Sequence, residues 1–166
     1  MASVYPSTQW SRLRRAALPG FAASDIAQGA PVCVASAGDE AFIMCTTAQQ
    51  KPVGVAADWA IAGNPLTVYD YGNTYRTSVG GNGAGASFAR QSYIGVIGTS
   101  QVAHPQSGVV ITTPLLGQVL PTGSPVGGGT AASSIWAVGV ARESAAVGDF
   151  AEYRIEPAVL SGIVNP

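Results

Sequence analysis

Short apolar runs separated by turn residues make up most of the chain. From Gly29 onwards, runs rich in Val, Ile, Tyr and Thr alternate with clusters of Gly, Pro, Asn and Asp. Such runs predict strands, and no segment after residue 30 keeps a helical period for three turns. The predicted strands are Pro31–Val34, Ala41–Cys45, Val53–Ala56, Leu66–Tyr69, Thr74–Val79, Tyr93–Ile97, Val109–Thr112, Ile135–Ala141 and Phe150–Ile155. The pattern therefore predicts an all-β fold, either a sandwich or a small barrel.

The first 28 residues differ in character from the rest of the chain. Residues 5–10 are aromatic and irregular, and Ser11–Leu18 has the length of about two helical turns before Pro19-Gly20 ends them. We therefore expect an extended N-terminal arm over residues 1–28 and a β-domain over residues 29–166. The chain shows no uninterrupted apolar stretch of the secretory type and no apolar run of 18 residues, so we expect neither an export signal nor a membrane span.

One segment of the β-domain occurs twice, at an offset of 85 residues. In both copies a β-run containing Gly is followed by a polar link and a returning β-run. The matching pieces are Pro52–Asp58 with Ala137–Glu143, Gly63-Asn64 with Gly148-Asp149, and Val68-Tyr69 with Tyr153-Arg154. The Gly inside each first run fits a bulge or a close backbone approach, and the Gly-polar pair fits a tight turn. We interpret the match as an internal duplication, with pseudo-repeats over 29–80 and 110–157 joined by Gly-rich loops. The alternative is a chance match among abundant Gly, Ala and Val.

Charge is scarce in this chain. It has 8 Lys and Arg and 9 Asp and Glu, so charged residues make up 10% of the sequence, against about 25% in an average soluble domain. A monomer with so few surface charges tends to associate. We therefore expect much of the surface to be covered by other copies or by a partner; the alternative is a monomer solubilised by Ser, Thr, Gln and Asn. The net charge of −1 gives no broad basic face, so we expect no nucleic-acid partner.

Residues for catalysis or metal binding are few. His104 is the single histidine, and its neighbours Pro105 and Gln106 favour a solvated turn. No G-x-S-x-G or H-E-x-x-H sequence is present, and Cys33 and Cys45 do not have zinc-site spacing. The two cysteines flank a predicted turn centred on residue 39, which would place them opposite each other across two strands as reduced core residues. We therefore expect no enzyme activity, no cofactor and no metal.

Part of the β-domain resembles a known family. Gly29-Ala30-Pro31-Val32 is followed by a Gly-Asp turn, then by Lys51–Ala56, and then by Gly63–Val68. This order is similar to that of small tailed-phage capsid decoration (cement) proteins, whose chains often read G-x-P-V, then P-x-G-V-A, then G-x-x-V-x-V. The second copy, from Val138 to Asp149, carries a weaker form of the same pattern. The chain is longer than the shortest family members and has additional Gly-rich loops.

The resemblance implies a non-enzymatic β protein, commonly a homotrimer, on the outer surface of a phage head assembled in the host cytoplasm. Its partners would be the major capsid protein and other copies of itself, and it would stabilise contacts between capsid subunits. The N-terminal arm would contact the capsid, through the residues Tyr5, Trp10, Arg12, Arg14 and Arg15. Trp and Arg often anchor interfaces, although a solvated helical turn would also explain the three arginines.

Two alternative functions remain at this stage. A glycan-binding or adhesin-like virion module would need aromatic residues exposed together on a loop face, with Trp59, Tyr69 and Tyr71 as candidates. A small β-fold hydrolase of the Ser-His type would need His104 as its base.

Overall fold

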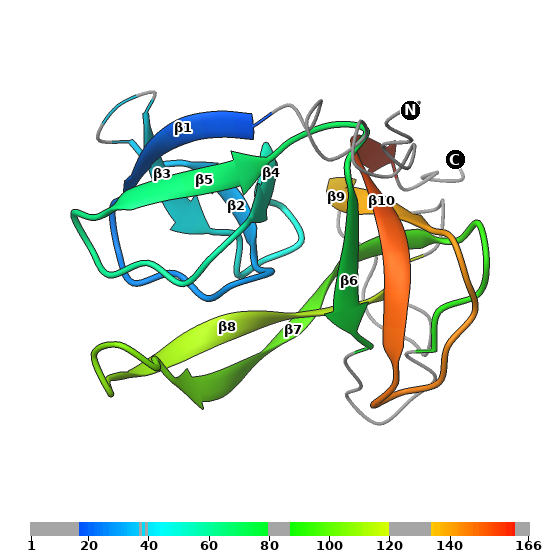
Figure 1. Cartoon of the computed structure of the whole chain (residues 1–166). Coiled ribbons are helices and arrows are strands. Elements are labelled where there is room, and N and C mark those ends of the chain that lie inside the picture. The colour runs from blue at the N-terminus through cyan, green and yellow to red at the C-terminus, as the bar shows by residue number, and fades with distance from the viewer. Residues whose placement is uncertain (1–16, 37, 39, 80–86, 120–133, 162–166) are drawn as a thin grey trace, which may run out of the picture.

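The described strands form two β units that follow one another along the chain (Figure 1). The computed structural model describes residues 17–36, 38, 40–79, 87–119 and 134–161. Unit 1 is a closed barrel of β1 (Ala17–Ala22), β2 (Pro31–Val34), β3 (Ala41–Met44), β4 (Gly54–Ala56) and β5 (Pro65–Tyr69). Unit 2 is a five-stranded sheet of β6 (Thr74–Ser78), β7 (Tyr93–Ala103), β8 (Val110–Val119), β9 (Ser134–Ala141) and β10 (Phe150–Ser161). The described residues contain no helix, which confirms the predicted all-β fold with a small barrel.

The barrel begins within the segment that the sequence assigned to the arm. Ala17 and Leu18 lie in strand β1 rather than in a helical turn, and β1 pairs along its length with β5. Ile26 is fully buried in unit 1 and forms a bridge to Ala60. Residues 17–28 therefore belong to the β-domain, and the predicted arm boundary at residue 28 is wrong. The predicted arm up to residue 16 and the two predicted Gly-rich loops, residues 80–85 and 123–129, lie outside the described residues.

Units 1 and 2 are built alike. Because β1 also pairs with β5, the closed strand order of unit 1 can be read from β3 as β3-β2-β4-β5-β1, and the order in unit 2, read from β8, is β8-β7-β9-β10-β6. The order and the residue pairing both make β6 to β10 the counterparts of β1 to β5. The equivalent residue pairs are Val55–Tyr69 with Val140–Arg154, Ala56–Val68 with Ala141–Tyr153, and Ala17–Tyr69 with Thr74–Arg154. The two units, residues 17–69 and 74–161, thus begin and end at other residues than the pseudo-repeats inferred from the sequence.

Two equivalent glycines explain why the repeated β-run contains Gly. A Cβ added to Gly54 would lie 2.3 Å from the carbonyl oxygen of Tyr69, and one added to Gly139 would lie 2.1 Å from that of Arg154. Both distances are far below a van der Waals contact. The close crossing of the two paired strands therefore requires Gly at this position in each unit.

Within the described residues, only unit 1 closes into a barrel. In unit 1, β1 runs parallel to β3 and pairs with it, and a Cβ on Gly20 would lie 2.4 Å from both the Glu40 carbonyl oxygen and the Phe42 ring. The position equivalent to Gly20 in unit 2 is Thr77, and β6 and β8 are the two edges of an open sheet. Unlike Gly20, Thr77 carries a Cβ, which would clash at the separation by which β1 approaches β3 in unit 1.

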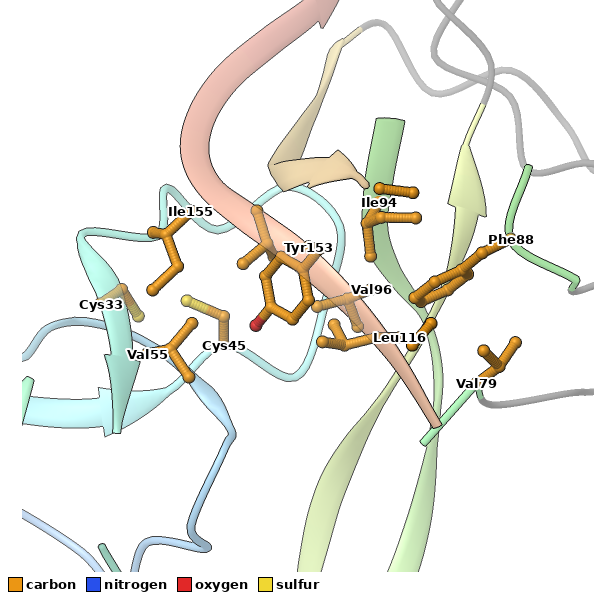
Figure 2. Packing of buried hydrophobic residues seen from close by; sticks show 13 residues of the cluster. Cys33, Cys45, Val55, Val79, Phe88, Ile94, Val96, Leu116, Tyr153 and Ile155 are labelled. Carbon is orange, nitrogen blue, oxygen red and sulfur yellow. The ribbon is translucent and has the colours of Figure 1, made fainter. Parts of the chain in front are cut away.

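The two units share one hydrophobic core. Figure 2 shows Val55 of unit 1 packed beside Tyr153 and Ile155 of unit 2, and all three side chains are fully buried. Cys33 and Cys45 of unit 1 belong to the same cluster, which continues through Ile94, Val96, Leu116 and Phe88 into unit 2. Burying side chains of this size contributes about 1.5–3 kcal/mol each. The shared core therefore fixes the two units to each other.

Candidate functional site

The residues predicted to bind a capsid lie outside the described part of the chain. Tyr5, Trp10, Arg12, Arg14 and Arg15 all precede Ala17, the first described residue. Their role therefore stays a prediction. The structure describes the folded body that follows them in the chain. This body begins with Ala17, the first residue of β1, which pairs with Tyr69.

Large apolar side chains are exposed at several separate places on this body. In unit 2, Val147 and Phe150 lie close together in sequence at the start of β10 and are 52% and 64% exposed. Val109 and Val110 are exposed at the tip of the β7–β8 hairpin, and Phe21 is exposed at the end of β1. Single exposed apolar residues are normal. Their combination with so few charges gives a surface that offers several apolar contacts to a partner.

His104 is buried, so the predicted solvated position is wrong. Its side chain lies between the hairpin tip and unit 1, where Nε2 is 3.1 Å from the carbonyl oxygen of Ala60 and the ring packs edge-on against Trp59. The backbone N–H groups of Gln106 and Ser107 donate to Nδ1. Nδ1 is therefore the acceptor, and Nε2–H donates to Ala60. His104 thus pins the hairpin of unit 2 onto unit 1 and has all of its polar atoms occupied by structural contacts.

The three aromatic residues proposed for glycan binding do not form one platform. Trp59 packs against His104, whereas Tyr69 packs against Tyr75 at the junction of the two units. Tyr71 is the one member of the three that is largely exposed. The structure therefore distributes these side chains among three different environments.

The two cysteines are free and buried, as the sequence predicted. The strand register pairs Cys33 with Ile43 rather than with Cys45, so the cysteines are not directly opposite each other. A hydrogen bond between the two thiols lowers the pKa of Cys33, and the same contact together with burial raises the pKa of Cys45. Their location in the shared core gives them a packing role between the units.

A basic depression of about 500 Å³ lies on the outer face of β9 and β10. Its lining includes Arg90, Arg142 and Arg154, which are three of the five basic residues that the structure describes. Gln91, Val140 and Ala141 complete the lining. Gln91 has a φ of +66°, a conformation that non-glycine residues rarely adopt, and its N–H donates to the carbonyl oxygen of Ala141.

The arginines of the depression differ in their ion pairs. Arg154 pairs with Glu156, whose carboxylate accepts a hydrogen bond from its guanidinium and thereby raises the pKa of Arg154. Arg142 lies 3.5 Å from the carboxylate of Glu152. Arg90 is exposed and forms no ion pair with any residue in the described ranges. Among the described residues, Arg90 is therefore the lining arginine whose charge no carboxylate balances.

No family model matches the chain. No curated protein matches it either. Among solved structures, the chain is similar to the crystal structure of the N base of head fiber gp8.5 in bacteriophage phi29. The two sequences are 14% identical, and the match covers 90% of this chain and 98% of that chain with a TM-score of 0.46. A similarity of this extent assigns neither family nor function to the chain.

The described residues also define what the body of the protein offers for chemistry. No group of three or more His, Cys, Asp or Glu side chains within them could hold a metal ion. Nor do the described residues contain a helix that could span a membrane.

The sequence did not predict the basic depression, because its arginines come from three separate segments. The repeat contains a signal that could have indicated it: Ala57 and Tyr69 of the first copy are replaced by arginines, Arg142 and Arg154, in the second copy.

Proposed function

We propose that the protein is a non-enzymatic structural component of a tailed-phage virion that decorates the outer surface of the head. In this proposal it is a homotrimer that binds the major capsid protein and stabilises contacts between capsid subunits. The observation that carries the proposal is the surface of the folded body, which combines scarce charge with exposed apolar side chains such as Phe150, Val110 and Phe21. The resemblance of residues 29–68 to capsid decoration proteins supports the same function.

The proposed mechanism is binding through several weak contacts at once. Apolar residues at the hairpin tip, at β1 and at the start of β10 are held in fixed relative positions, because the two units share one core. Once one contact forms on a rigid body, the next is effectively intramolecular, so modest contacts add up to firm attachment. The arm residues Trp10, Arg12, Arg14 and Arg15 would add a further contact to the capsid.

Co-sedimentation with phage heads tests this function. Heads of the phage that carries this gene, prepared without the protein, are mixed with purified full-length chain and pelleted. We expect saturable binding, with a number of bound copies that is a multiple of three for each equivalent lattice position. A chain that begins at Ala17 keeps β1 and the barrel intact and isolates the contribution of the arm. Binding that does not saturate, or no binding to heads, contradicts the proposal.

A surface variant sharpens this experiment. Phe150 is 64% exposed at the start of β10, so Phe150→Ser removes an apolar contact without opening the core. The matched control is Thr67→Ser, an exposed polar position on β5. We expect Phe150→Ser to weaken binding to heads and Thr67→Ser to leave it unchanged, with both variants keeping the melting temperature of the parent.

A further inference from the structure

The basic depression of unit 2 occupies the same place as a contact that is filled in unit 1. Arg154 and Gln91 of the depression are the counterparts of Tyr69 and Gly29. In unit 1 the ring of Tyr75 lies over this place, because a Cβ on Gly29 would meet that ring at 2.9 Å. Tyr75 belongs to β6 of unit 2. The equivalent face of unit 1 is therefore already covered by a side chain of unit 2.

The chemistry of this face changes between the two units. In unit 1, Val55 is fully buried beneath unit 2, and Tyr69 packs against Tyr75. The residues of unit 2 at these positions, Val140 and Arg154, face the open depression. Ala57 of unit 1 is likewise replaced by Arg142. A contact face that is apolar and covered in one unit is thus basic and open in the other.

We propose that this depression is a docking site for a carboxylate-bearing segment of a protein partner. Charge complementarity favours this occupant, since the lining residues include three arginines and no acidic residue, and Arg90 has no carboxylate partner within the described residues. Guanidinium groups bind carboxylates through paired N–H donors, which gives both attraction and orientation. The carboxylates of Glu152 and Glu156 hold Arg142 and Arg154 at the walls and leave Arg90 to meet the incoming acid.

The inference deepens the proposed function and rests on it in one respect, namely that the partner is a protein of the virion. It names a third contact region, distinct from the arm and from the exposed apolar residues. The site requires no residue before Ala17. The inference also predicts that the partner protein has an acidic surface where it contacts β9 and β10.

The test is a titration of the ¹⁵N-labelled full-length chain with an end-blocked hexaglutamate peptide, followed by backbone amide shifts. We expect the amides of Gln91, Ala141 and Arg142 to shift, and hexaglutamine to cause no shift. Arg90→Gln removes the unpaired charge at an exposed position and is expected to weaken binding about tenfold. Lys51→Gln is the matched control, since it removes one positive charge from a site beside Trp136, outside the depression, and is expected to leave the affinity unchanged.

Several results would overturn the inference. Equal affinity of the parent and Arg90→Gln, shifts located elsewhere on the chain, or no shift at all would each contradict it. Inorganic phosphate or oligothymidylate binding as tightly as hexaglutamate at the same ionic strength would also contradict it, since the site would then select anions in general or nucleic acid. The titration contains no phage heads, so its failure is distinguishable from a failure of head binding, which would remove the proposed function instead.

Discussion

Gly29 and Gln91 occupy equivalent positions in the two units, and both have a positive φ, of +77° and +66°. Each donates its N–H to an equivalent carbonyl oxygen, that of Ala56 for Gly29 and that of Ala141 for Gln91. The backbone of this turn is therefore the same in both units, whereas the space above it is not. Gly29 lies beneath the ring of Tyr75, and Gln91 faces the basic depression.

This relationship predicts opposite responses to exchange of the two residue types. Gly29→Gln places a side chain against the Tyr75 ring in a left-handed conformation, and we expect it to lower the free energy of unfolding by about 2–3 kcal/mol. Gln91→Gly removes the strain of a left-handed non-glycine residue, and we expect a change within about 1 kcal/mol, in either direction, because Gly also makes the unfolded chain more flexible. Urea denaturation measures both. Equal losses from the two exchanges would contradict the equivalence.

The glycines within the repeated β-run give a second prediction. We expect Gly54→Ala and Gly139→Ala each to destabilise the protein by about 3 kcal/mol or more, because the new methyl group would overlap a carbonyl oxygen of the paired strand. Gly63→Ala and Gly148→Ala are the matched controls at the equivalent turns, where no heavy atom lies within 4 Å and only the positive φ opposes the change. They should cost about 1–2 kcal/mol. Thermal melts of the four variants would refute the close-approach argument if all four were equally destabilised.

Tyr153 gives a prediction about pH. Its side chain is fully buried between the units, and within the described residues its hydroxyl has no hydrogen-bond partner. Burial raises the pKa of Tyr153 and of Tyr75 above the value for an unfolded tyrosine. The folded state therefore keeps protons that the unfolded state releases, so stability is fully present below about pH 10 and falls as the pH rises further.

The variant Tyr153→Phe isolates this effect. Removing an unpartnered buried hydroxyl should raise the free energy of unfolding by about 1 kcal/mol at neutral pH and reduce the loss of stability in alkali. Urea denaturation from pH 7 to pH 11 provides both numbers. A loss of stability at neutral pH would instead show that the hydroxyl has a hydrogen-bond partner.

His104 gives a prediction about the hairpin. We expect His104→Ala to destabilise the protein by about 2–4 kcal/mol, because it removes a buried ring and the Nδ1 acceptor of the Gln106 and Ser107 N–H groups. Hydrogen exchange should become faster at Gly108 and Val109, whose contacts depend on the ordered tip. Gln106→Ala is the control, since that side chain is exposed. Unchanged exchange in His104→Ala would mean that other contacts hold the hairpin to unit 1.

The sequence predicted the strands better than it predicted how the strands pack. The nine predicted strands correspond to β2 to β10, because alternation and turn residues are local signals. Strand β1 was missed because Pro19 and Gly20 are read as breakers, although Gly20 is what permits the closure of the barrel. His104 was placed in solvent because its turn was recognised, whereas the Trp59 ring beneath it comes from a distant part of the chain.

For the candidate site, too, the sequence indicated composition but not the three-dimensional arrangement. The scarcity of charge is visible in the sequence, but the gathering of Arg90, Arg142 and Arg154 around one depression depends on how β9 and β10 lie beside the turn at Gln91. Nor does the sequence indicate that Tyr75 covers the equivalent face of unit 1, because that contact depends on how the two units dock.

Electron cryomicroscopy of phage heads with and without this protein tests the central claim most directly. The account predicts additional density on the outer surface of the head that accommodates the two-unit body and contacts at least two neighbouring major capsid subunits. Heads whose density is identical with and without the protein, or density found only on the tail, would contradict it.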